Sequence, residues 1–272
     1  MFQRLPTVGA LVVYIDFAAL RAAGVQQLLE GSRQGEKAQE EPEYRSFVAK
    51  TDFDWKQDLD AAMVAFAPTG NFMLVKGRFD WKTLTNYVRG QDGNCNNSFC
   101  RMQGSTPERR ISFFPLQSGV MALAVSSDEA AALRMSSIDP RPDREIPAAP
   151  VWISIPPSIV GSGQALPEGT QMFARSLEGA QSVTLALSPQ GDAFAARLDV
   201  RCGNAADAAG IAGQLTKATS ILRELIAHEN KQPNPADLSG FLTSGTFQQA
   251  GTRVEGHWPV GRQLIVNLLG GD

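Results

Sequence analysis

The chain has 272 residues, of which 43% are hydrophobic and 19% charged, and its 25 basic residues nearly balance its 28 acidic ones. This composition is typical of globular proteins, and the length allows one large or two small domains. The sequence has no cluster of Lys and Arg, so we expect no nucleic-acid partner. It also has no apolar run of about 18 residues, so we expect no membrane span.

The chain begins with a predicted strand and helix. The apolar run Leu11–Ile15 is typical of a buried strand and lacks the charged start and cleavage pattern of a signal peptide. Asp16 is a candidate helix cap, and the apolar residues after it recur at helical intervals as far as Leu29. The next stretch, 31–44, is strongly charged and predicts an exposed loop.

Two hairpins and two helices fill the rest of the first half. The segment Pro68-Thr69-Gly70-Asn71 separates two apolar runs and predicts a turn, since proline presets φ and glycine tolerates positive φ. The predicted elements are strands at 61–67 and 72–75, a helix at 81–89, strands at 111–114 and 120–125, and a helix at 128–135.

A proline-rich segment, 138–150, predicts a linker because prolines interrupt both strands and helices. It would separate a first half, 1–137, from a second half, 151–272. In the second half we expect strands at 151–155, 183–187 and 193–200, short helices near 156 and 235, a long helix at 205–228, and a last hairpin bending at 248–252.

The two halves share a repeated turn. Pro189-Gln190-Gly191-Asp192 repeats the pattern of Pro68–Asn71 between two apolar runs, and a helix follows each hairpin. We therefore expect an α+β fold with a duplication, in which two similar split βαβ (ferredoxin-like) halves have antiparallel sheets with helices packed on one face. Chance similarity of two unrelated α+β halves is the alternative.

A second repeat lies within the first half, where the tetrapeptide Phe-Asp-Trp-Lys occurs at Phe53–Lys56 and again at Phe79–Lys82. Aspartate is a preferred helix N-cap and a preceding aromatic can staple the first turn, so we interpret Asp54 and Asp80, like Asp16, as structural caps rather than ligand-binding groups. Asp52, Asp58 and Asp60 add carboxylates nearby, but their spacing departs from that of calcium loops, and we predict no metal there.

The cysteines and histidines do not form a recognisable metal or catalytic motif. Cys95 and Cys100 lie close together, either as a local disulfide of an exported protein or as free thiols of an intracellular one. With Cys202, His228 and His257 they lack the paired spacing of zinc ligands. No phosphate loop, dinucleotide fingerprint or nucleophile elbow occurs in the sequence, so we expect no cofactor and no metal.

Three segments of the first half resemble an uncharacterised family of exported bacterial proteins with duplicated α+β halves. They are Val12–Asp16 with Ala19 and Leu20, Phe53 to Asp60, and Lys76–Asp80. The resemblance implies an exported or periplasmic location, with the signal segment missing from this sequence, and it implies no activity and no site residues.

The leading functional hypothesis is a non-enzymatic cell-envelope module that binds an unknown protein or small molecule. Two other classes stay open. One is an enzyme with an acid/base site built from His257 and a carboxylate such as Asp54 or Asp80. The other is a structural domain whose charged loop, 31–44, contacts a partner. A deep pocket that joins His257 to a carboxylate would favour the enzyme, and a shallow or apolar groove would favour binding.

Overall fold

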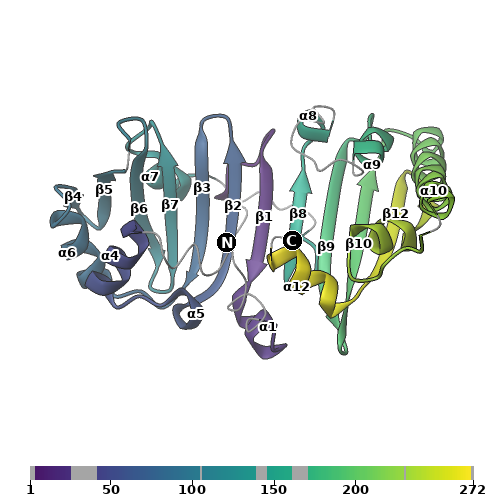
Figure 1. The fold of residues 1–272 in the computed structure, drawn as a ribbon. Coiled ribbons are helices and arrows are strands. Elements are labelled where there is room, and N and C mark those ends of the chain that lie inside the picture. The colour runs from purple at the N-terminus through teal and green to yellow at the C-terminus, as the bar shows by residue number, and fades with distance from the viewer. Residues whose placement is uncertain are drawn as a thin grey trace. The chain divides into compact units, whose positions relative to one another are not determined.

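The computed structural model describes residues 4–25, 42–104, 106–138, 146–160, 171–229 and 231–270. Among these, the chain divides into two compact units, the first ending at Ala148 and the second beginning at Ala149. Each unit combines an antiparallel sheet with helices, so the α+β class is confirmed (Figure 1).

Within the described residues, the first unit is built on seven antiparallel strands, in the order β1-β2-β3-β7-β6-β5-β4. Their bounds are β1 Leu11–Asp16, β2 Leu59–Ala67, β3 Gly70–Gly77, β4 Asn94–Asn96, β5 Phe99–Gln103, β6 Arg110–Gln117 and β7 Val120–Ser126. The helices are α1 Phe17–Ala22, α4 Pro42–Thr51, α5 Trp55–Asp58, α6 Trp81–Arg89 and α7 Ala131–Ser136.

Helices cover both faces of this first sheet. Ser112 and Phe113 are neighbours on β6, so their side chains point to opposite faces. The Ser112 hydroxyl accepts a hydrogen bond from Ala132 N of α7 at 3.2 Å, whereas Phe113 packs with Leu84 and Val88 of α6. The expectation that helices pack on one face only is therefore wrong for this unit.

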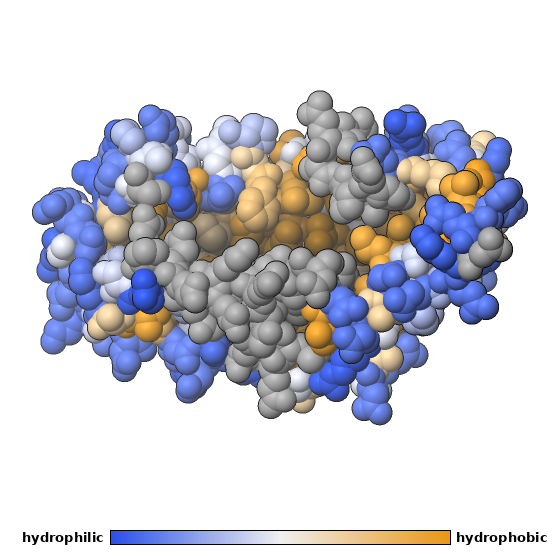
Figure 2. Space-filling model, in the orientation of Figure 1, coloured by the Kyte–Doolittle hydropathy of each residue, from blue (hydrophilic) through white to orange (hydrophobic). Residues whose placement is uncertain are grey.

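The α6 face of the sheet continues as an apolar surface across the first three strands. Val13, Val64 and Met73 lie opposite one another on β1, β2 and β3, and all three are half-buried. Phe66, two residues along β2, is 43% exposed. Figure 2 shows apolar side chains gathered over this part of the sheet.

The described part of the second unit has five antiparallel strands, in the order β8-β9-β10-β12-β11. They are β8 Val151–Ile155, β9 Ser182–Gln190, β10 Ala193–Arg201, β11 Thr246–Ala250 and β12 Arg253–Val260. The helices are α8 Pro157–Val160, α9 Gln171–Ser176, α10 Ala205–His228, α11 Leu238–Ser244 and α12 Arg262–Gly270. None of the helices in the described residues is long and apolar enough to cross a membrane.

Strand β12 shows why this sheet has one buried and one polar face. Val254, Gly256, Trp258 and Val260 are buried while the residues between them are exposed, as strand periodicity requires. Trp258 stacks on Phe241 of α11 at a centroid distance of 5.4 Å. The apolar stripe of α10 adds Ala208, Ile211, Leu215 and Ala218 to the buried side.

The strand order does not confirm the split βαβ expectation. In that arrangement a later strand inserts between the first and second strands, but here β1 pairs directly with β2, and β8 with β9. The physical reason is that a hairpin pattern in the sequence does not reveal which strands pair across long connections, such as those from β1 to β2 and from β8 to β9.

Two local expectations also need correction. The helix predicted to reach Leu29 ends at Ala22, and Gly24 then takes a φ of +67°. Most of the charged loop 31–44 lies outside the described residues, but its last part is helical because α4 begins at Pro42. Proline is well tolerated in the first turn of a helix, because backbone N–H groups there have no acceptor within the helix and the N–H that proline lacks is not needed.

Candidate functional site

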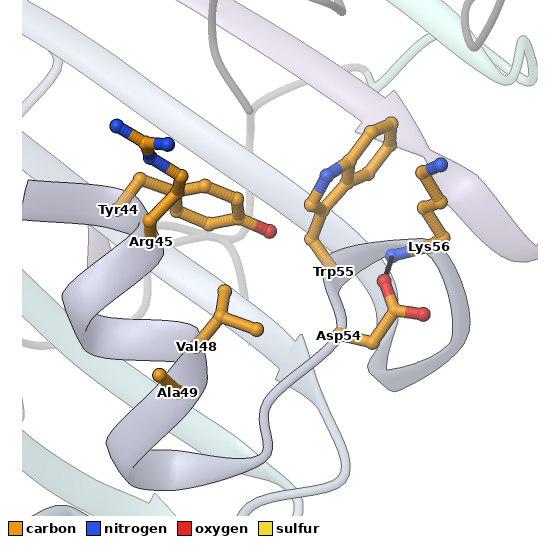
Figure 3. Close-up of a pocket in the computed structure, with 7 residues that line it drawn as sticks. All are labelled: Tyr44, Arg45, Val48, Ala49, Asp54, Trp55 and Lys56. Atoms are coloured by element: carbon orange, nitrogen blue, oxygen red, sulfur yellow. Dashed lines mark hydrogen bonds between the residues drawn. The ribbon is translucent and has the colours of Figure 1, made fainter. Parts of the chain in front are cut away.

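A cavity of about 350 Å³ lies between α4 and the start of α5 (Figure 3). Helix α4 contributes positions 44, 45, 48 and 49, which share one side of the helix because they recur about every turn. Figure 3 shows the Tyr44 and Trp55 rings on opposite sides of one space, with Val48 between them. The lining residues are Tyr44, Arg45, Val48, Ala49, Asp54, Trp55 and Lys56.

Asp54 holds the α5 side of the cavity in place. Its Oδ1 accepts a hydrogen bond from Lys56 N at 2.9 Å, and its Oδ2 accepts one from Gln57 Nε2 at 3.3 Å. Its own backbone N–H donates to Asp58 Oδ2 at 2.8 Å. The Asp54 carboxylate is therefore used in forming the turn that carries Trp55, as an N-cap requires.

Each of the two rings of the cavity has contacts with the protein. The indole of Trp55 meets Phe17 edge-on, with ring centroids 6.0 Å apart. Burial raises the pKa of the Tyr44 phenol, and the negative charge of Asp54 adds to this, against a smaller opposing effect of the Trp55 backbone N–H. The Tyr44 hydroxyl therefore stays protonated at neutral pH and can donate a hydrogen bond.

The lining chemistry is that of a binding cavity. Two aromatic rings, aliphatic side chains and the cationic Arg45 and Lys56 line it, while its carboxylate is part of a helix cap. A mostly apolar cavity with a few polar groups that orient a ligand is typical of small-molecule sites.

The other two predicted caps lie at helix starts. Asp80 Oδ1 accepts hydrogen bonds from Lys82 N and Thr83 N, both at 3.0 Å, and the Thr83 hydroxyl donates to Oδ2 at 2.8 Å. The Thr83 backbone N–H and hydroxyl lower the pKa of Asp80. Asp16 accepts a hydrogen bond from Ala19 N at 2.8 Å at the start of α1.

Two of the remaining carboxylates of the acidic cluster pair with arginines. Asp58 pairs with Arg78 at 3.1 Å, and Asp60 pairs with Arg21 at 3.3 Å. Asp52 has a left-handed φ of 54° at the end of α4. Among the described residues, no group of three or more His, Cys, Asp or Glu side chains could hold a metal ion.

Cys95 and Cys100 form a disulfide across the β4–β5 pair, where they lie directly opposite each other. Cys100 is also buried in the cluster beneath α6. Cys202 is a buried free thiol in the second unit. His228 is exposed at the last residue of α10.

His257 lies apart from these groups, in a groove of about 460 Å³ on the polar face of the second sheet. Arg197 lies opposite His257, and Glu255 is the next residue along β12 on the same face. His257 is exposed, and within the described part of the chain no hydrogen bond joins its ring to a carboxylate. Asp54 and Asp80, its suggested partners, belong to the first unit, where both serve as helix caps.

No protein-family model matches the chain, and no curated protein matches its sequence. Solved structures of TP0453, a bacterial protein, are similar in fold. Crystal forms I, III and IV of TP0453 give TM-scores of 0.50, 0.53 and 0.51 at 11%, 11% and 10% identity. They cover 98–99% of this chain and 95–97% of that one. At such low identity the similarity shows the fold alone.

Most of the cavity was not predicted from the sequence. Of its lining residues, only Asp54, Trp55 and Lys56 belong to a motif noted above, the repeated Phe-Asp-Trp-Lys segment, and Tyr44 was expected in a loop. The spacing of Tyr44 and Val48, four residues apart with Phe47 and Thr51 following the same turn, was the available signal for α4.

Proposed function

We propose that the protein is a non-enzymatic binding module of the cell envelope and that its ligand is a small molecule held between α4 and α5. The observation that carries this proposal is the 350 Å³ cavity faced by the Tyr44 and Trp55 rings. Cavities of roughly 300–1,000 Å³ bind small organic ligands. Both rings are held by protein contacts before a ligand arrives, which reduces the entropic cost of binding.

An exported location is part of this proposal. The disulfide between Cys95 and Cys100 supports it, because disulfides persist in oxidising compartments and are rare in the cytosol.

Descent of the two units from a duplicated ancestor is also part of the proposal. In each unit a hairpin that contains a Pro-x-Gly-[Asn/Asp] segment joins the second strand to the third, with the loop at Pro68–Thr69 in the first unit and at Gly191–Asp192 in the second. The strand orders β1-β2-β3-β7-β6 and β8-β9-β10-β12-β11 then follow the same path. This common path is what supports duplication.

The experiment that tests the binding function fills the cavity. Ala49 is exposed on α4 and lines the cavity, so Ala49→Trp should block it while leaving the fold intact. The neutral fluorescent probe N-phenyl-1-naphthylamine should bind the natural protein and lose at least tenfold in affinity in this variant. Ala227→Trp, at an exposed position of α10, is the matched control and should bind normally. Equal binding by all three proteins would overturn the proposal.

A second candidate function is acid/base catalysis in the groove of the second sheet. One observation favours it, namely that Glu255 and His257 line the same groove. If an activity is found by substrate screening, this candidate requires His257→Gln to abolish turnover while the protein stays folded. Retained turnover would exclude it.

A further inference from the structure

The cavity between α4 and α5 is unusual in its charge. Arg45 and Lys56 bring two cationic groups to it, and Asp54 brings the single carboxylate. With two cationic groups against one carboxylate, the lining carries a net positive charge.

The uncharged part of the lining selects for a flat ligand. Tyr44 and Trp55 present rings on opposite sides of the space in Figure 3, and Val48 closes it from below. A flat ring between two aromatic side chains gains stacking or edge-to-face contacts in addition to the burial of apolar surface.

The Tyr44 hydroxyl adds a directional preference. Because burial and the Asp54 charge both favour the protonated phenol, Tyr44 can supply an O–H donor at neutral pH. An O–H donor complements an anionic oxygen, and a guanidinium such as that of Arg45 pairs with carboxylate, sulfonate and phosphate groups through parallel N–H donors.

Resting on the proposed binding function, we infer that the ligand of this cavity is an organic anion that carries a flat ring. The ring lies between Tyr44 and Trp55, and the anionic group pairs with Arg45. Neutral compounds of the same shape bind the same cavity more weakly, because they gain the ring contacts without the charge pairing.

Two probes with the same ring system test this inference. 8-Anilino-1-naphthalenesulfonate carries a sulfonate that N-phenyl-1-naphthylamine lacks, and both report binding by fluorescence. For each probe, the binding that Ala49→Trp removes defines the occupancy of this cavity. At low salt, Arg45→Gln should weaken cavity binding of the sulfonate probe by about fivefold, as expected for an exposed charge pair, and change that of the neutral probe by less than about twofold.

Arg197→Gln is the matched control, since Arg197 is an exposed arginine on the second sheet and should leave both probes unaffected. Trp55→Ala should weaken both probes. If Arg45→Gln changes both probes equally while Ala49→Trp still blocks them, the inference about charge fails and the proposed binding function stands. If Ala49→Trp blocks neither probe, the binding function fails, and the inference fails with it.

Discussion

Phe53 and Phe79, the first residues of the two Phe-Asp-Trp-Lys segments, stack on each other with ring centroids 6.1 Å apart and planes 9° from parallel. Phe47 of α4 meets Phe53 edge-on at 5.7 Å. The contacts in the series Phe47–Phe53–Phe79 therefore connect α4 to the residue that precedes α5. They also connect both helices to the apolar cluster under α6, against which Phe79 packs. These contacts fix the separation of the two walls of the cavity.

The first prediction follows from this series. Phe53→Leu should lower the free energy of unfolding by about 1 kcal/mol, as a conservative core substitution does, and should also weaken binding of N-phenyl-1-naphthylamine. Phe241→Leu is the control, because Phe241 stacks on Trp258 in the second unit. Phe241→Leu should lower the free energy of unfolding by a similar amount without changing the affinity for the probe. If both variants changed the probe affinity equally, the role of Phe53 in the cavity would be contradicted.

The second prediction concerns the caps. Asp54→Ala should lower the free energy of unfolding by about 1 kcal/mol, because Lys56 N loses its acceptor. Asp54→Asn should retain most of the stability, since asparagine is an equally good N-cap. Chemical denaturation measures both variants, and an Ala variant as stable as the natural protein would argue against the cap.

The third prediction is a pH dependence. The pKa of Asp80 is lowered in the folded protein, mainly by the Thr83 N–H and hydroxyl. A lowered folded-state pKa gives stability that is present above the unfolded-state value of about 3.9 and is lost as the pH falls through the folded-state value. Above about pH 4 the natural protein should therefore be more stable than the Asp80→Asn variant. The difference in their free energies of unfolding should shrink as the pH falls below about 4, because the Asp80 carboxylate becomes protonated. A constant difference in melting temperature from pH 6 to pH 2.5 would contradict this.

The fourth prediction compares two glycines. A Cβ on Gly77 would lie 2.2 Å from the backbone oxygen of Asp58, which also accepts a hydrogen bond from Arg78 N at 2.8 Å. Gly77→Ala should therefore destabilise the protein by roughly 2–3 kcal/mol. A Cβ on Gly213 of α10 meets nothing within 4 Å, so Gly213→Ala should stabilise by about 0.5–1 kcal/mol. The reverse order in denaturation would refute the close approach.

The fifth prediction is the thiol count. Protein purified without reductant should show one reactive thiol in denaturant, that of Cys202, and three after reduction. Three thiols before reduction would contradict the disulfide and remove its support for an oxidising compartment.

Sequence patterns predicted the elements with strong local signals. The α10 stripe gave the helix from Ala205 to His228 in full, and Asn204 caps it by accepting a hydrogen bond from Asp207 N at 2.8 Å. The Pro-x-Gly turns correctly predicted the hairpins β2–β3 and β9–β10.

Features that depend on tertiary contacts could not be predicted in this way. Strands β4 and β5 are short, with 3 and 5 residues, and they carry little periodicity. Helix α4 follows a charged stretch, and its Phe47 contacts Phe53, just beyond the end of the helix, and Tyr87 of α6, which is too distant in sequence for a local pattern to reveal. Because α4 forms one wall of the cavity, a sequence pattern that does not predict α4 cannot predict the cavity either.

The central claim is that the space between Tyr44 and Trp55 holds a ligand. A crystal structure of the protein soaked with 8-anilino-1-naphthalenesulfonate tests this most directly. The account predicts the naphthalene ring between Tyr44 and Trp55 with the sulfonate toward Arg45. An ordered probe on the half-exposed face of β1–β3 near Phe66, with the α4–α5 cavity empty, would contradict it.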